Sequence, residues 1–321
     1  MTRATRTVRL AVTLGDPRGI GPEVADGAAR ILAAEEPAIR LLFVGPEALA
    51  PANAQEVEPV LMSDGAHDPA HAGRVAATAI RQAVRLALAG DVSGIVTAPI
   101  DKAALHAAGE PFPGHTEMLA ELTGAPDVAM LMNAETTPLG GALRVVLATK
   151  HVALASVPGL LSPELFVSQA RLVERALRED WRIERSRIAL CAVNPHASDG
   201  GLFGDEEARI VVPALEALRA AGVDATGPVP ADTVFVRALR GEFDVVIAPY
   251  HDVGMAAFKT ASFGHGVNVT LGLPFVRTSP DHGTALDIAG KGVADPSSMA
   301  EAIRLAARLA RAREALSGMH A

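Results

Sequence analysis

Three histidines stand at matching places in the sequence, each shortly after an apolar run typical of a buried β-strand. "RVVLATKH" ends at His151, "IALCAVNPH" at His196 and "FDVVIAPYH" at His251, each histidine being the third residue after the run. Because parallel strands end at one edge of an α/β sheet, we expect the three imidazoles to meet there. Imidazoles bind Zn²⁺ and similar cations, and three ligands leave positions open for catalysis. Alternatively, each is an ordinary histidine at the start of a loop.

Charged side chains near these histidines could transfer protons. Asp252 directly follows His251 and could orient its imidazole or contact the metal, and Lys259 is expected beyond a loop that Gly254 opens. Asp232 lies in the polar turn of "PVPADTVF". A metal that acidifies a hydroxyl, with a base that accepts its proton, is what alcohol oxidation uses. Asp232 could equally be a helix N-cap, because "ADTVFVRAL" has a helical pattern.

Other segments predict contacts with an anion. "PFPGHTEMLAEL" places His115 and Thr116 at the start of a helical pattern, where backbone N–H groups attract negative charge, although Thr116 could simply cap the helix. "NVTLGLPFVRTSPDHGT" adds Asn268 and Arg277. An unpaired guanidinium among apolar residues is costly, so Arg277 should pair with a carboxylate or phosphate. Together with Lys259, these residues indicate a small anionic substrate.

The glycine-rich stretches match no classical nucleotide-binding motif. In "GDPRGIGPEV" the glycines stand at positions 15, 19 and 21, which is neither G-x-G-x-x-G nor G-x-x-x-x-G-K-[ST]. The residues by themselves therefore predict a metal site with anion contacts in an α/β protein. They do not predict a redox cofactor.

The elements that must position these residues alternate along the chain, which favours a largely parallel sheet covered by helices. Strands are predicted at 8–14, 40–44, 93–98, 143–149, 187–193, 244–248 and 267–271. Helices are predicted at 70–89, 163–179, 206–220 and 298–316. The length of 321 residues suggests two domains. We expect the chain to cross between them at 135–141, "ETTPLGG", and its last helix to return to the first domain.

Bulk composition excludes several classes of protein. The net charge of −8 argues against a general nucleic-acid surface, and no apolar run approaches the roughly 20 residues of a membrane helix. The N-terminal apolar run is too short for a signal peptide. Cys191 is the single cysteine and cannot form an internal disulfide. We therefore expect a cytoplasmic enzyme with no nucleic-acid or membrane partner.

The motifs resemble a known family, 4-hydroxythreonine-4-phosphate dehydrogenase of the vitamin B6 pathway. The resemblance covers residues 15 to about 296, nearly the whole chain. It is carried, in order, by "GDPRGIGPE", "PGHTEMLA", "NPHASDGGLFGDEE", "GPVPADTVF", "YHDVGMAAFK" and "GVNVTLGLPFVRTSPDHGTALDIAGKG". The segment "DHGTALDIAGKGVADP" is also similar to the adenosine-binding loop of isopropylmalate and isocitrate dehydrogenases.

This resemblance implies a fold and a reaction. The fold is that of the isocitrate/isopropylmalate dehydrogenase-like superfamily, with two α/β/α domains and a central cleft. We place the first, discontinuous domain at 1–134 plus 277–321 and the second at 135–276. The implied reaction is the oxidation of a secondary alcohol by NAD or NADP, followed by loss of CO₂ from the β-keto acid. One divalent metal is implied, Zn²⁺ first and Mg²⁺ or Co²⁺ as alternatives, in a homodimer with active sites at the interface.

The resemblance also assigns roles to individual residues. His151, His196 and His251 would bind the metal, with Asp232 and Asp252 near it. Lys259, Asp232 and Asp252 are the candidate catalytic residues. Substrate contacts fall to His115, Thr116, Lys259, Asn268 and Arg277. Coenzyme contacts fall to His282, Gly283, Thr284, Asp287, Ala289, Gly290 and Asp295.

Three positions depart from the family pattern. Val253 replaces the usual glutamine after "YHD", Lys150 replaces a threonine and Pro280 replaces a common valine. Similar enzymes oxidise 4-phospho-D-threonate, 4-phospho-D-erythronate or the cis-dihydrodiol of terephthalate, so these substrates remain alternatives. "NPHASDGGLFG" is similar to the dihydrodiol enzymes, whereas "GHTE" and Arg277 favour a phosphorylated hydroxy acid. A metal-dependent hydrolase or lyase and a non-catalytic phosphoester-binding protein are the alternatives from other classes.

Overall fold

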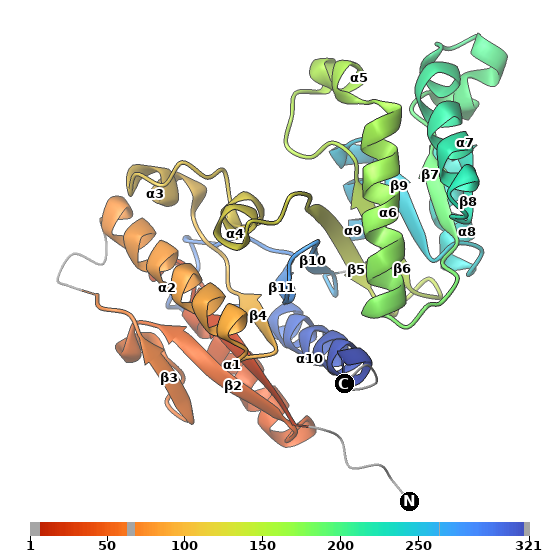
Figure 1. Cartoon of the computed structure of the whole chain (residues 1–321). Coiled ribbons are helices and arrows are strands. Elements are labelled where there is room, and N and C mark those ends of the chain that lie inside the picture. The colour runs from red at the N-terminus through yellow and green to blue at the C-terminus, as the bar shows by residue number, and fades with distance from the viewer. Residues whose placement is uncertain (1–6, 63–67, 263, 318–321) are drawn as a thin grey trace, which may run out of the picture. The chain divides into compact units, whose positions relative to one another are not determined.

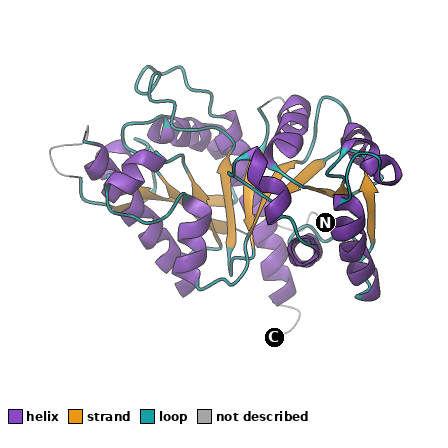
Figure 2. Cartoon of the chain, turned by 90° about the horizontal axis from the view of Figure 1, so that it is seen from above, coloured by secondary structure: helices purple, strands orange, loops and turns teal. Residues whose placement is uncertain are grey.

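Strands and helices alternate because β-branched runs alternate with Ala-, Leu- and Arg-rich stretches along the sequence. The computed structural model describes residues 7–62, 68–262 and 264–317 (Figure 1). It forms two compact units, one of Met1–Pro126 with Val267–Ala321 and one of Asp127–Gly266. Helices lie on both sides of the strands (Figure 2). The predicted α/β class is confirmed.

The first unit holds a sheet in the order β3-β2-β1-β4-β11-β10. Its strands are parallel except β10, which pairs antiparallel with β11. The strands are β1 (Val8–Thr13), β2 (Ile39–Gly45), β3 (Glu56–Pro59), β4 (Gly94–Thr97), β10 (Val267–Leu271) and β11 (Val276–Pro280). The helices are α1 (Gly21–Glu35), α2 (Pro69–Ala89), α3 (Lys102–Ala107), α4 (His115–Thr123) and α10 (Ser297–Ser317), with the short η1 (Glu47–Leu49). Helix α10 packs against α1, β1, β4 and β11, as its predicted return to this unit requires.

The second unit holds a sheet in the order β5-β6-β9-β7-β8, in which only β5 runs antiparallel. The strands are β5 (Ala129–Ala134), β6 (Leu143–Leu147), β7 (Ile188–Cys191), β8 (Ala225–Val229) and β9 (Val245–Ala248). The helices are α5 (Val157–Leu160), α6 (Pro163–Glu179), α7 (Val212–Ala220), α8 (Ala231–Leu239) and α9 (His251–Ser262). Shorter helical turns are η2 (Leu154–Ser156), η3 (Pro195–Gly201) and η4 (Glu207–Val211). Alternate side chains of its strands enter a core that includes Leu147, Ala189 and Phe258.

Strand pairing places the boundaries of the units 8 and 10 residues earlier than the predicted 134/135 and 276/277. Strand β5 pairs with β6, so it belongs to the second unit, and β10 pairs with β11, so it belongs to the first. The segment 135–141 is therefore the turn of the β5–β6 hairpin, closed by a bridge between Thr137 and Gly140. The prediction of a crossing between domains at this segment is wrong, because its glycines serve a tight turn.

Local capping explains where the long helices begin and end. Asp68 precedes α2 and accepts a hydrogen bond from the backbone N–H of His71 at 3.0 Å, and Gly90 ends the helix in the left-handed conformation. Ser162 caps α6 in the same way through the N–H of Leu165, at 3.2 Å. These are the ordinary start and stop residues of helices. They lie at or next to the predicted ends of both helices.

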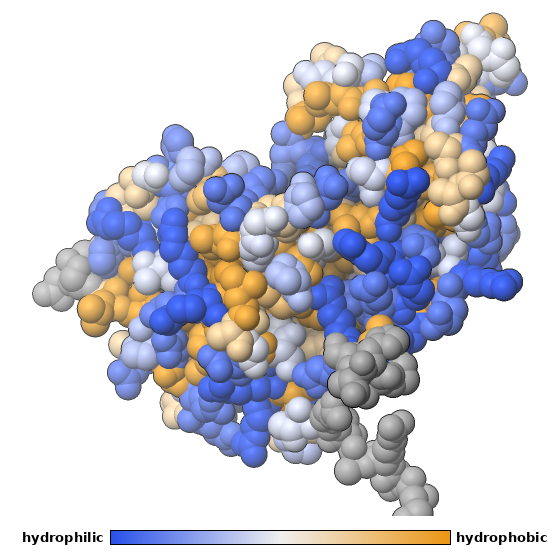
Figure 3. All heavy atoms as spheres, in the orientation of Figure 1, coloured by the Kyte–Doolittle hydropathy of each residue, from blue (hydrophilic) through white to orange (hydrophobic). Residues whose placement is uncertain are grey.

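The molecular surface carries mixed chemistry. On the face drawn in Figure 3, hydrophilic side chains are interspersed with apolar ones. Among the described residues, no helix combines the length and apolar character needed to cross a membrane.

Candidate active site

The three predicted metal-binding histidines follow neighbouring parallel strands of the second unit. Strand β9 lies between β6 and β7 and pairs with both, so the three carboxyl ends meet at one edge of the sheet. We call this edge of the sheet, with His151, His196 and His251, the histidine edge. The expectation of equal spacing after the strands is wrong, because the histidines follow the last strand residue by four, five and three positions respectively.

Two of these imidazoles lie side by side. The ring centroids of His151 and His251 are 5.5 Å apart, with the ring planes tilted by 44°. The carboxylate of Asp252 lies 2.7 Å from Nδ1 of His251. A carboxylate on one ring nitrogen fixes the orientation of the ring and leaves Nε2 available to a metal, as at known metal sites. The donor chemistry of this pair therefore fits a divalent cation.

The third histidine is not gathered with them. Among the described residues of one chain, no group of three or more His, Cys, Asp and Glu side chains is placed to hold a metal ion. His196 is exposed and lies in η3, where the backbone is left-handed. One chain by itself thus brings together two of the three predicted ligands.

Helix α9 carries His251, Asp252 and Lys259, where the sequence predicted a loop after the histidine. Gly254 suggested that loop, but it is buried inside the helix. A β-carbon at Gly254 would lie 2.5 Å from Cδ2 of Leu147 and 3.1 Å from Cβ of Ala248. The glycine therefore allows α9 to pack closely against the sheet, and Lys259 lies roughly 12 Å along the helix from His251.

The acidic residues after β7 and β8 surround the single cysteine. Asp232 is the second residue of α8, whose N-cap is Pro230, so the alternative role of Asp232 as N-cap is wrong. Burial, together with the carboxylates of Glu207 and Asp232, raises the pKa of the Cys191 thiol to about 12. The thiol is therefore protonated and is no nucleophile.

The first unit contains a buried cation that forms no ion pair with any described residue. Arg277 lies in β11 with 2% of its surface exposed and donates to the hydroxyls of Thr270, at 2.9 Å, and Thr97, at 2.6 Å. Its Nε has no hydrogen-bond partner, and in the described part of the chain it forms no ion pair. Burial lowers the pKa of the guanidinium to about 10, and the carboxylate of Glu117 partly opposes this shift. Arg277 thus has two hydroxyl partners, while Glu117 acts on it electrostatically without forming an ion pair among the described residues.

His115 stands near this arginine as a neutral group. It begins α4 and is half-buried, and its Nε2 is buried without a hydrogen-bond partner. Burial lowers the pKa of His115 well below its usual value, and the positive charges of Arg277 and Lys102 lower it further. Thr116, 9% exposed, is not the cap of α4, because the N-cap is Gly114 and forms no side-chain capping bond. Asn268 in β10 likewise leaves a buried Oδ1 without a partner.

We call Arg277, His115, Thr116, Asn268 and Lys102 the anion site. Lys102 was not among the predicted site residues. It begins α3, and its Cε lies 3.6 Å from the place that a β-carbon on Gly114 would occupy, next to the start of α4. Its position after strand β4, as one of only four lysines, was the feature in the sequence that could have identified it. Two cations, a neutral imidazole and the N–H groups of a helix start suit a phosphate or carboxylate.

The segment predicted to bind the coenzyme connects β11 to α10 and is anchored on the start of α1. The carbonyl of Thr284 accepts from the N–H of Ile20 at 2.9 Å, and Glu23 accepts from the N–H of Ala294 at 3.1 Å. Gly283, Asp287 and Gly290 are exposed on it, while His282, Thr284 and Ala289 are half-buried. The last predicted residue, Asp295, accepts from the N–H of Ser297 at 2.9 Å and so orders the start of α10.

Comparisons with known proteins agree with the motifs. A family model described as pyridoxal phosphate biosynthetic protein PdxA matches residues 29–306. The 4-hydroxythreonine-4-phosphate dehydrogenase of Caulobacter vibrioides is 43% identical over 329 residues, which cover 95% of this chain and 98% of the relative. The D-threonate 4-phosphate dehydrogenase of Pectobacterium atrosepticum is 41% identical over 94% of this chain and 99% of the relative.

A solved structure gives the same result at the level of the fold. The crystal structure of 4-hydroxythreonine-4-phosphate dehydrogenase from Klebsiella pneumoniae is 40% identical and matches with a TM-score of 0.84. The match covers 96% of this chain and 100% of that structure. The family resemblance inferred from the motifs is therefore confirmed, and the chain belongs to the family of the pyridoxal phosphate biosynthetic protein PdxA.

Proposed function

We propose that the protein oxidises 4-phosphohydroxy-L-threonine with NAD⁺ or NADP⁺ and decarboxylates the product, as 4-hydroxythreonine-4-phosphate dehydrogenase. The dehydrogenases among its relatives support the reaction class and a nicotinamide coenzyme. The observation that carries the proposal for the substrate is the buried Arg277, which donates to two hydroxyls and forms no ion pair among the described residues.

The anion site is suited to the phosphate group of this substrate. Removing a cation from water without a counter-ion costs several kcal/mol, and a bound phosphate would offset that cost. Arg277 and Lys102 would supply positive charge, and His115 would supply a neutral ring beside them. The N–H groups at the start of α4, which no side chain caps, would complete the contacts.

The chemistry needs a hydride acceptor and a proton acceptor. The segment that contains His282, Thr284 and Asp287 would hold the nicotinamide coenzyme, which would supply the acceptor for the hydride of the secondary alcohol. The hydroxyl proton passes to one of the three candidate bases, Lys259, Asp232 or Asp252. The resulting β-keto acid then loses its carboxylate as CO₂, and the carbanion equivalent that remains is protonated.

We assign His151, His196 and His251 to one divalent cation, Zn²⁺ first and Mg²⁺ or Co²⁺ as alternatives. Bound there, the cation would lower the pKa of the substrate hydroxyl and accept electron density during decarboxylation. Within the described part of one chain, only His151 and His251 come together. The proposal therefore includes a homodimer whose active sites use both copies.

A second substrate has a specific observation in its favour. The D-threonate 4-phosphate dehydrogenase of Pectobacterium atrosepticum is nearly as similar to this chain as the relatives that act on the vitamin B6 intermediate. The departures Lys150, Val253 and Pro280 lie at or next to the proposed ligands and the coenzyme segment. The anion site would accept the phosphate of either compound, so the choice depends on the other end of the substrate.

A coenzyme-reduction assay tests these proposals. Zn²⁺-loaded protein is given NAD⁺ or NADP⁺ with 4-phosphohydroxy-L-threonine, 4-phospho-D-threonate or the terephthalate dihydrodiol, and the reduced coenzyme is followed by its absorbance. We expect the highest kcat/KM with 4-phosphohydroxy-L-threonine and no turnover without metal. Failure with all three substrates would overturn the proposal, and release of phosphate without coenzyme would favour a hydrolase or lyase.

A further inference from the structure

The turn that carries His196 has an unusual backbone. His196, Ala197, Ser198 and Asp199 have φ angles of 51°, 55°, 66° and 43°, and Gly200 continues the series at 69°. Residues with a β-carbon seldom adopt this left-handed conformation, because the β-carbon approaches the following carbonyl. Four such residues in succession require contacts elsewhere that hold the turn in this shape.

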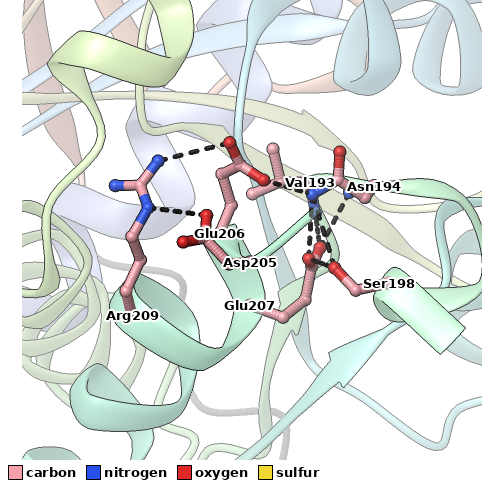
Figure 4. Close-up of polar contacts among 7 residues, drawn as sticks. All are labelled: Val193, Asn194, Ser198, Asp205, Glu206, Glu207 and Arg209. Atoms are coloured by element: carbon pink, nitrogen blue, oxygen red, sulfur yellow. Dashed lines mark hydrogen bonds and ion pairs between the residues drawn. The ribbon is translucent and has the colours of Figure 1, made fainter. Parts of the chain in front are cut away.

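One carboxylate makes most of those contacts, while that of Glu206 accepts only one hydrogen bond from the turn, from the amide of Asn194 at 2.7 Å. Oε1 of Glu207 accepts from the backbone N–H groups of Val193 and Asn194, both at 2.8 Å. Oε2 accepts from the amide of Asn194 at 3.0 Å and from the hydroxyl of Ser198 (Figure 4). Three of the four donor groups precede His196 in the sequence and one follows it. The carboxylate thereby fastens the turn on both sides of the histidine.

Glu207 does not act as an ion-pair partner. It is 4% exposed, and in the described part of the chain it pairs with no cation. The nearby Arg209 is directed instead to Asp205 and Glu206, at 3.0 and 3.2 Å (Figure 4). A buried carboxylate without a counter-ion depends on its hydrogen-bond donors, and those of Glu207 all belong to this turn.

We propose that Glu207 is a positioning residue for His196: it holds the left-handed turn and so fixes where this histidine can bind a metal. The inference rests on the proposed function, in which His196 is a ligand. Glu207 itself contacts neither metal nor substrate. Groups that orient metal ligands from outside usually alter metal affinity about 10–100-fold when they are removed.

Three variants separate this role from a general contribution to stability. Glu207→Ala removes all four hydrogen bonds. Glu207→Gln keeps an oxygen for the two backbone donors, but its amide can only donate to Ser198 and cannot accept from Asn194. Asp205→Asn is the matched control, because it removes one charge two residues away without touching the turn.

The measurement is the dissociation constant of Zn²⁺ for the full chain, by competition with a chromophoric chelator at a temperature where circular dichroism shows each variant folded. We expect Glu207→Ala to raise this constant about 10–100-fold, Glu207→Gln to raise it less and Asp205→Asn to leave it unchanged. Excess Zn²⁺ should restore much of the turnover of Glu207→Gln, which a purely structural defect would not allow.

Two outcomes would overturn different claims. If Glu207→Ala, or Glu207→Gln where the alanine variant does not fold, binds Zn²⁺ as tightly as the unchanged protein, the positioning role is wrong. A parallel His196→Ala variant tests the ligand itself. Unchanged Zn²⁺ affinity in that variant would contradict the proposed metal site rather than the role of Glu207 in shaping the turn.

Discussion

The anion site of the first unit and the histidine edge of the second unit differ in how far their side chains are desolvated before a ligand binds. In the anion site, Arg277 is buried and His115 half-buried in advance, and each leaves a nitrogen atom without a partner. At the histidine edge, His151 and His196 are exposed on connections after strands, and one chain gathers only two of the rings. The side chains of the anion site therefore lose their water when the protein folds, whereas those of the histidine edge lose it when a ligand binds.

This difference predicts how each site responds to substitution. Exposed ligands contribute little to folding, so their loss should affect activity alone. Buried groups without a counter-charge destabilise the unliganded protein. Their removal should therefore weaken ligand binding without lowering the free energy of unfolding. Four experiments test the contrast.

The largest effect is expected for His251→Ala. Loss of a metal ligand should lower kcat by about a thousandfold or more, because a bound cation supplies several kcal/mol of charge stabilisation. The melting temperature should change little. Steady-state kinetics and calorimetry check both points, with His265→Ala as control, since His265 is an exposed histidine of the same unit. Equal loss in both variants would contradict a specific role of His251.

Arg277→Met should raise KM for the phosphorylated substrate about a hundredfold, because a buried charge pair with the phosphate is lost. The free energy of unfolding of the unliganded protein should stay the same or rise, because an uncompensated charge is removed. Denaturant unfolding and kinetics measure the two quantities. Arg81→Met, which breaks an exposed ion pair with Glu110, is the control. A large decrease in the free energy of unfolding of Arg277→Met would mean that the arginine stabilises the fold.

Asp252→Asn should weaken Zn²⁺ binding by about tenfold, at the lower end of what such orienting carboxylates contribute. The carboxylate is 86% exposed, so solvent screens its interaction with His251. A chelator competition measures the affinity. If Asp252→Asn binds Zn²⁺ as tightly as the wild-type protein, Asp252 does not orient His251.

The smallest effect concerns the pH dependence of stability. Because the pKa of His115 is lowered in the folded protein, the unfolded chain binds the proton first. Stability should therefore fall as the pH drops below about 6.5, by at most about 1.4 kcal/mol per pH unit. Unfolding curves across this range test it, and His115→Gln should reduce the slope while His106→Gln, exposed on α3, should not. An unchanged slope in His115→Gln would mean that other groups titrate.

The sequence predicted those features that depend on local pattern. Helix α2 and helix α6 were found from their Ala-, Leu- and Arg-rich patterns, and strands β6, β7 and β9 from apolar runs that lead to histidines. Four strands were missed: β3, β8 and β11 contain Glu, Gly, Arg or Pro residues that do not resemble a buried strand, and the apolar β5 has no β-branched residue. Their pairing with neighbouring strands decides their structure, and a local pattern cannot show it.

At the candidate site, the residues themselves were easier to predict than their structural surroundings. Arg277 was expected to need an anion because of its apolar surroundings, and the structure gives it only hydroxyl partners. Glu207 was missed because its role arises from an unusual backbone. Lys102, marked only by its rarity and its position after β4, received no role because its neighbours in the site are distant in sequence. Gly254 was misinterpreted, because a glycine that permits close packing looks the same in a sequence as one that opens a loop.

The environment of Cys191 has a practical consequence. The protein's only natural thiol is buried and protonated, so alkylating dyes and spin labels should leave it untouched. Cysteines introduced at exposed alanines, such as Ala103 in the first unit and Ala256 in the second, would then be the sole points of attachment. Paired probes at those positions would report, in an otherwise unaltered protein, whether coenzyme and phosphorylated substrate change the separation of the two units.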